Sequence, residues 1–121
     1  MADSVEVVVA SPDAGLRGQV SLALGGGRFA VTEVTDTGEV VDRIAQHPPD
    51  VLIADARLEG HGALALARTL RDQPETATVR VLVLTSPGDP LPEDAPGVDA
   101  ALTTPFTSLA LLRRLEAVLA P

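Results

Sequence analysis

The sequence predicts an α/β domain built on a parallel β-sheet, and three observations support that prediction. Short runs of β-branched and other apolar residues alternate along the chain with segments of helical apolar spacing. The connections between successive runs are long enough to hold crossover helices, as parallel strands require. The length of 121 residues and the apolar fraction of 45% suit one domain, residues 1–121, with a single core.

The expected strands differ in how continuous their apolar runs are. Val5–Ala10 is nearly continuous, which is typical of a central strand covered on both faces. Phe29–Val34 alternates more, so it is expected nearer an edge. The other expected strands are residues 51–54, which run into Asp55, and then residues 79–84 and 98–102. Five strands joined by right-handed crossovers suggest the flavodoxin-like order 2-1-3-4-5.

The expected helices begin at residues whose side chains can accept hydrogen bonds from the free N–H groups of the first turn. Ser11 is expected to cap the first helix, with Pro12 at its first position and Asp13 in its first turn. The second helix has two candidate caps, Asp36 and Thr37, and the last helix also has two, Thr107 and Ser108. The expected inward positions are Leu16, Val20, Ala23 and Leu24; Val40, Val41 and Ile44; Ala63, Leu66, Ala67 and Leu70; and Leu111, Leu112, Leu115, Val118 and Leu119.

The connection between the fourth and fifth strands breaks the pattern. It contains four prolines and two glycines, at positions 87, 90, 92 and 96 and at positions 88 and 97. Proline removes a helical donor and clashes with the preceding turn. The fourth helix is therefore expected to be shortened or missing, with at most one short turn near residues 91–95.

The composition excludes several classes of function. The formal charge of −8 argues against direct binding of nucleic acid, which needs clustered basic residues. The chain has no Cys, which excludes disulfides and zinc–thiolate sites, and no apolar run long enough to span a membrane. We therefore expect a soluble cytoplasmic protein. All nine basic residues are arginine, so the chain contains no lysine.

Candidate site residues cluster where the expected strands end, because ligands of open α/β sheets bind beyond the carboxyl ends of the strands. Asp55 is a carboxylate at the end of a buried strand, and Thr85 can offer a hydroxyl beside it. The other residues at these ends are Val9, Ala10, Ser11, Ser86, Thr103, Thr104 and Pro105.

The chain resembles the receiver domain of two-component response regulators. The resemblance rests on residues 49–55 (Pro-Asp-Val-Leu-Ile-Ala-Asp), Leu58 and Gly62, residues 81–85 and residues 99–106, in that order. It implies that Asp55 accepts a phosphoryl group from a histidine kinase and that Thr85 hydrogen-bonds that group. It also implies a protein partner, which is a histidine kinase or a downstream signalling protein.

The sequence departs from the family pattern at the residues that support phosphorylation. The family has two adjacent acids after the first strand, which hold Mg²⁺; here the positions are Val9-Ala10, or Ala10-Ser11 in a shifted alignment. Thr104 stands where the family has lysine, and Ala101 replaces the aromatic switch residue. Because phosphoryl transfer depends on neutralising charge, these losses are expected to be costly.

We therefore expect a degenerate receiver, or pseudo-receiver, that is not an enzyme, needs no cofactor and binds a protein partner without phosphorylation. The alternative is an atypical working receiver, phosphorylated on Asp55, with Thr85 and Thr104 contacting the phosphoryl group and with Mg²⁺ as cofactor. Asp55 and Asp13 are the weak candidates for a metal site, although Asp13 is expected to point away from the pocket. A small-ligand binder or an enzyme on the same fold is a third possibility, and the two histidines, His47 and His61, are expected to be exposed. The output, the partner's identity and the oligomeric state are left open.

Overall fold

The computed structural model describes residues 4–25, 27–58, 62–88 and 95–120. Its centre is a five-stranded sheet in the order β2-β1-β3-β4-β5, and every strand pair is parallel. The strands are β1 (Val5–Ala10), β2 (Phe29–Val34), β3 (Val51–Asp55), β4 (Arg80–Thr85) and β5 (Ala100–Thr103). The predicted fold class and strand order are confirmed.

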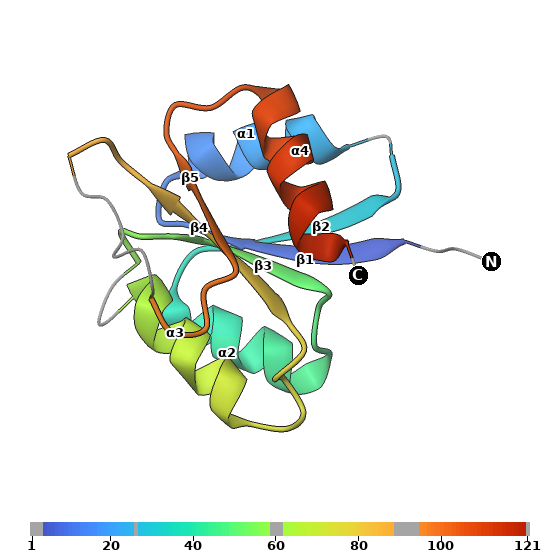
Figure 1. Cartoon of the computed structure of the whole chain (residues 1–121), viewed down its shortest axis with the longest axis vertical. Helices are drawn as coiled ribbons and strands as arrows, with labels where there is room; N and C mark the ends of the chain where they lie inside the picture. Colours follow the sequence, from blue (N-terminus) through green and yellow to red (C-terminus); the bar gives the residue numbers. More distant parts are fainter. Residues whose placement is uncertain (1–3, 26, 59–61, 89–94, 121) are drawn as a thin grey trace.

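Four helices in the described residues cover the two faces of this sheet. They are α1 (Ala14–Leu24), α2 (Thr37–Gln46), α3 (Gly62–Asp72) and α4 (Ser108–Leu119). Figure 1 shows α1 and α4 on one face and α2 and α3 on the other. No helix in these ranges is long and apolar enough to cross a lipid bilayer.

The apolar core lies in two layers, one on each side of the sheet, because successive strand residues point to opposite faces. Val8 and Ala10 of β1 pack in the layer under α2 and α3, whereas Val7 and Val9 pack in the layer under α1 and α4. All five residues of β3 are buried. A strand that is buried on both faces has a nearly continuous apolar sequence, as residues 51–54 of β3 do.

Most expected inward positions are buried, four are partly buried and one is exposed. Val41 of α2 is half exposed, whereas its neighbours in the expected stripe, Val40 and Ile44, are buried. Successive helix residues are turned by about 100° around the axis, so Val41 lies at the solvent side of the stripe that Val40 and Ile44 form. Leu109 at the start of α4 is exposed, and Leu22 of α1 more so.

The first helix begins later than its expected cap. Asp13, not Ser11, caps α1, with its Oδ1 accepting from the N–H groups of Gly15 (2.8 Å) and Leu16 (3.2 Å). Ser11 is fully buried instead, and its hydroxyl accepts from the N–H of Asp13 at 3.0 Å. Of the paired candidates for the other helices, Asp36 caps α2 and Thr107 caps α4.

The end of the β4–β5 connection that precedes β5 is held against α3. Arg71 of α3 donates to the carbonyl oxygens of Ala77 and Gly97 and to Oδ2 of Asp99, which in turn accepts from the N–H of Val81 at 2.8 Å. Gly97 has φ +82°, and a Cβ there would lie 2.6 Å from the Ala67 carbonyl oxygen. The described parts of this connection contain no helix, while the short turn expected near residues 91–95 falls mostly outside the described residues.

Candidate functional site

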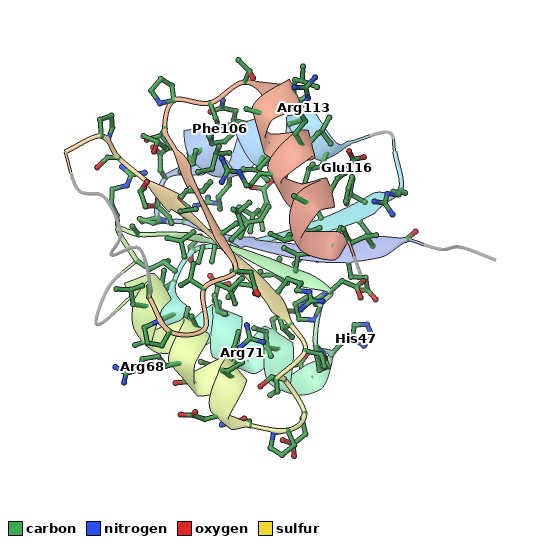
Figure 2. The ribbon with its side chains drawn as sticks, in the orientation of Figure 1. His47, Arg68, Arg71, Phe106, Arg113 and Glu116 are labelled. Carbon is green, nitrogen blue, oxygen red and sulfur yellow. The ribbon has the colours of Figure 1, made fainter. Side chains whose placement is uncertain are left out.

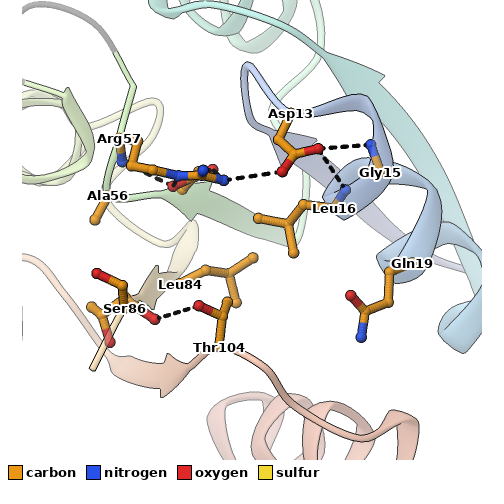
Figure 3. Close-up of a pocket in the computed structure, with 11 residues that line it drawn as sticks. Asp13, Gly15, Leu16, Gln19, Ala56, Arg57, Leu84, Ser86 and Thr104 are labelled. Carbon is orange, nitrogen blue, oxygen red and sulfur yellow. Dashed lines mark hydrogen bonds and ion pairs between the residues drawn. The ribbon is translucent and has the colours of Figure 1, made fainter. Parts of the chain in front are cut away.

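A pocket of about 370 Å³ lies at the carboxyl ends of the central strands, where the fold class places ligands. It lies between the start of α1, the β3–α3 connection and the ends of β4 and β5 (Figure 3). Its lining residues are Asp13, Gly15, Leu16, Gln19, Asp55, Ala56, Arg57, Leu84, Thr85, Ser86 and Thr104. The structure thus brings together Asp55, Thr85, Thr104 and Asp13, four of the residues singled out from the sequence.

The carboxylate of Asp55 lies at the end of β3, and its side chain is 3% exposed. Oδ1 accepts from the backbone N–H of Arg57 at 2.9 Å and from Arg57 Nε at 3.1 Å. Oδ2 accepts from the hydroxyl of Ser11 at 2.6 Å, from Arg57 Nη2 at 2.8 Å and from Arg57 Nε at 3.2 Å. The buried charge is therefore surrounded by donors from the chain itself.

Arg57 reaches this carboxylate from the β3–α3 connection, two residues after Asp55. Its Nη2 also lies 3.5 Å from Oδ2 of Asp13, so one guanidinium bridges carboxylates at the start of α1 and the end of β3. Asp13 is oriented for this contact because its other oxygen caps α1. The Arg57 side chain is 58% exposed, so it covers the carboxylate from the solvent side.

The pKa values of these groups follow from the contacts. Burial raises the pKa of Asp55, but hydrogen bonds from Arg57 and Ser11 outweigh it and hold the value below its usual range. The N–H groups of Leu16 and Gly15 lower the pKa of Asp13. The hydrogen bonds to Asp55 raise the pKa of Arg57, so all three groups carry their charges at neutral pH.

The two threonines of the pocket hydrogen-bond elsewhere. Thr85 is buried at the end of β4, with its hydroxyl oxygen 3.5 Å from that of Thr103. The Thr104 hydroxyl donates to the carbonyl oxygen of Thr85 at 3.2 Å, next to the cis Thr104–Pro105 peptide bond. Their positions in the pocket fit a contact with a group on Asp55, and their present partners are local.

The residue after β1 that meets Asp55 is Ser11. Val9 is fully buried in the core layer under α1 and α4, and Ala10 is fully buried in the opposite layer. The shifted alignment, Ala10-Ser11, therefore describes the pocket better than Val9-Ala10. The position nearest Asp55 holds a hydroxyl in place of the family's carboxylate.

The side chains that line the pocket do not suit Mg²⁺ as ligands, because this ion prefers six oxygen ligands in octahedral geometry. Only two of the described lining residues are acids, Asp13 and Asp55, and Arg57 lies between them. Asp13 thus lines the pocket, contrary to the expectation that it points away, because the later helix start turns its side chain inward. Within the described ranges, no group of three or more His, Asp or Glu side chains is placed to hold a metal ion.

The sequence reasoning missed the roles of Arg57 and Ser11. The sequence did contain a sign of the role of Ser11: it is the only polar residue in the two alternative alignments, Val9-Ala10 and Ala10-Ser11. Arg57 had none, because nothing in the periodicity says which way a loop arginine turns. His47 is exposed as expected, with its Nε2 2.7 Å from Oε2 of Glu6, at the opposite end of β1. His61 lies outside the described residues.

The fold and the site together define a class: an open, doubly wound α/β domain with a buried aspartate at the end of its third strand. Solved structures of response regulators share this fold. One from Chloroflexus aurantiacus superposes with a TM-score of 0.90 at 27% identity, over 98% of this chain and 100% of that chain. The chemotaxis response regulator CheY4 of Vibrio cholerae has a TM-score of 0.86 at 23% identity, over 95% and 98%.

Curated relatives agree with the structures. The transcriptional regulatory protein CseB of Streptomyces coelicolor is 31% identical over 122 residues, and the match covers 98% of this chain and 51% of CseB. The phosphate regulon transcriptional regulatory protein PhoB of Pseudomonas aeruginosa is 28% identical over 119 residues, covering 93% of this chain and 51% of PhoB. The chain spans about half the length of these relatives. No family model matches the chain. Sequence and fold together identify the chain as a receiver domain of two-component response regulators.

Proposed function

We propose that this receiver domain acts in the cytoplasm as a protein-interaction module whose contacts do not depend on phosphorylation of Asp55. The observation that supports the proposal is that hydrogen bonds from the chain itself already occupy the Asp55 carboxylate. A carboxylate offers about four lone-pair sites, and Asp55 already accepts from four N–H and O–H groups of Arg57 and Ser11, of which Arg57 Nε contacts both oxygens. A nucleophile whose lone pairs are held in this way is poorly disposed to attack phosphorus.

The rest of the pocket supports the same proposal. A transferring phosphoryl group needs cations and donors aimed at its equatorial oxygens. Thr104 stands where the family has lysine, and its hydroxyl is directed at a backbone carbonyl. Ala10 and Ser11 supply no carboxylate for a metal ion. Because so little remains to neutralise charge, we expect neither Mg²⁺ nor another cofactor to be needed.

The partner is proposed to be a protein, either a histidine kinase or a downstream signalling protein. Two relatives are named transcriptional regulatory proteins, so control of transcription is the proposed output. The charge of −8 argues that any contact with nucleic acid is made by another domain or protein. The described residues hold no arrangement of nucleophile, base and oxyanion donors, which favours a binding module over an enzyme.

The proposal is tested by amide NMR of the wild type with Mg²⁺ and beryllofluoride, a mimic of a phosphoryl group on aspartate. We expect no specific shift changes. Saturable changes at residues around Asp55, lost in Asp55→Asn, would overturn the proposal. Tryptophan fluorescence cannot replace NMR, because the chain has no tryptophan.

An atypical working receiver is the second candidate, favoured by the place of Asp55, Thr85 and Thr104 around one pocket. It is tested by incubating the protein with acetyl phosphate and measuring the intact mass. The first proposal expects no added phosphoryl mass. A mass gain that Asp55→Asn abolishes would favour the working receiver instead.

A further inference from the structure

We propose that Arg57 is a built-in inhibitory cation: its guanidinium, and not only the loss of the family's acids and lysine, keeps Asp55 from reacting with a phosphoryl donor or its mimic. The inference deepens the proposed function and rests on it, since it explains why Asp55 is silent. It assigns a role to a residue that neither the sequence pattern nor the pocket's resemblance to other receivers singles out.

The contacts point to Arg57 more than to any other group. Four of the five donor contacts on the Asp55 carboxylate come from Arg57, and three of those come from its side chain. Without that side chain, Oδ1 keeps one backbone N–H and Oδ2 keeps the hydroxyl of Ser11. Roughly half of the carboxylate's four or so lone-pair sites would then be free.

The charges in the pocket lead to the same residue. Of the described lining residues, Arg57 alone carries a positive charge, and it faces the two acids, Asp55 and Asp13. The nearest basic neighbour on α1 is directed elsewhere: Arg17 donates to the Ser11 carbonyl and pairs with Glu33 at 3.4 Å. Charge-assisted bonds of this kind are about twice as strong as neutral ones, so the guanidinium is not easily displaced.

The exposure of Arg57 makes a purely structural role a poor explanation. Its side chain is 58% exposed and belongs to neither core layer. Among the described residues, its hydrogen-bond and ion-pair partners are Asp55 and Asp13, so removing it leaves the packing of the sheet intact. A variant without this side chain is therefore expected to fold.

The chemical step that Arg57 opposes is a simple substitution. A lone pair of a carboxylate oxygen of Asp55 attacks the phosphorus of acetyl phosphate, and a new O–P bond forms. The bond between phosphorus and the acetyl oxygen breaks, acetate leaves with the electron pair, and nothing is oxidised or reduced. The oxygen must be released from the guanidinium before its lone pair can attack.

The experiment compares wild type, R57A and R57Q with R68A, which removes an arginine from the exposed outer side of α3 (Figure 2). The same set is made in an S11D background, which returns one carboxylate to the position that faces Asp55. Intact-mass measurement quantifies labelling by acetyl phosphate. Amide NMR detects binding of Mg²⁺ with beryllofluoride. Circular dichroism confirms that each variant is folded, and D55N/R57A identifies the modified residue.

We expect R57A and R57Q to be labelled about tenfold faster than the matched parent in at least one background, as expected for the loss of one charge-assisted contact. R68A should behave as its parent, and D55N/R57A should show no labelling. A smaller ratio in both backgrounds overturns the inference, as does slower labelling, which would make Arg57 a helper. Labelling of the wild type on Asp55 would refute the proposed function separately, because the inference concerns only the ratio.

Discussion

Two Arg–Asp clusters lie at opposite ends of the same sheet, and they serve different purposes. At the carboxyl ends of the strands, Arg57 lies 2.8 Å from a carboxylate that is 3% exposed. At the amino ends of β4 and β5, Arg71 lies 3.1 Å from Asp99, whose side chain is 27% exposed. The pairs look alike as ion pairs, but their surroundings differ.

The difference lies in what else each arginine reaches. Arg71 also donates to two backbone carbonyls, so it joins α3 to the chain before β4 and to the chain before β5 (Figure 2). Within the described part of the chain, Arg57 reaches two carboxylates, and both line the pocket. An arginine that binds backbone from several segments holds the fold together, whereas one that binds only pocket acids sets the charge of the pocket.

The largest expected effect is at Gly97, in the amino-end cluster. G97A places a Cβ against the Ala67 carbonyl and forces a side chain into φ +82°, which should lower the free energy of unfolding by about 2–4 kcal/mol. The measurement is urea denaturation. G18A is the matched control: a Cβ there meets nothing within 4 Å, and the helical site should gain about 0.5–1 kcal/mol. Equal effects at the two glycines would show that the close approach to α3 does not hold in solution.

The variants R71A and R57A test the difference between the two arginines directly. R71A loses bonds to Gly97, Ala77 and Asp99 and should cost about 2 kcal/mol, whereas R57A should cost about 1 kcal/mol, because its side chain is largely solvated. Both are read from denaturation midpoints with unchanged slopes. If R57A were the more damaging variant, the assignment of Arg71 to the fold and Arg57 to the pocket would be reversed.

Acid should weaken the pocket cluster through Asp55. Its folded pKa lies below the ordinary 3.8, so its share of stability is complete above that value and is lost as pH falls through the lowered pKa. D55N removes this proton uptake, so below pH 4 its stability should fall less steeply, by up to about 1.4 kcal/mol per pH unit. Thermal melts between pH 2 and pH 7 provide the measurement. Identical slopes for wild type and D55N would mean that the carboxylate is not held by its donors.

The smallest expected effect is none at all. Millimolar Mg²⁺ should leave the melting temperature of the wild type unchanged, because Arg57 lies between the two acids of the pocket and a ligand stabilises only a state that it binds. Differential scanning fluorimetry with an external dye measures this, with Ca²⁺ as the matched ion. A saturable rise specific to Mg²⁺ would reveal a metal site that these contacts do not suggest.

Much of the fold could be predicted from residue patterns. The nearly continuous apolar run in β1 indicated a central strand, the run in β3 indicated a buried strand, and the capping roles of Asp36 and Thr107 were among the predicted choices. Boundaries were less accurate. Residue 79 and residues 98–99, expected in strands, lie outside them: Val79 and Val98 donate to turn carbonyls, and the side chain of Asp99 accepts from the N–H of Val81 in β4. Apolar side chains occur in both settings, so composition alone does not separate them.

The candidate site was predicted in part. Asp55, Thr85 and Thr104 line the pocket as the order of the motifs indicated. The inward turn of Asp13 could not be read from spacing, because it follows from a helix start two residues later than Ser11. The partners of Asp55 were also out of reach, since a loop arginine is free to extend into solvent or to fold back.

Periodicity and residue identity are local properties of the chain, so residue patterns were enough to predict the parallel α/β architecture and to show that the family's acids and lysine are absent. The contact of Ser11 with Asp55 and the bridge of Arg57 between Asp55 and Asp13 depend on how distant segments pack. A shift of one residue at a strand end turns a side chain to the other face of the sheet. The contact of Arg57 with Asp55 likewise depends on the fold, which buries that carboxylate within reach of the arginine.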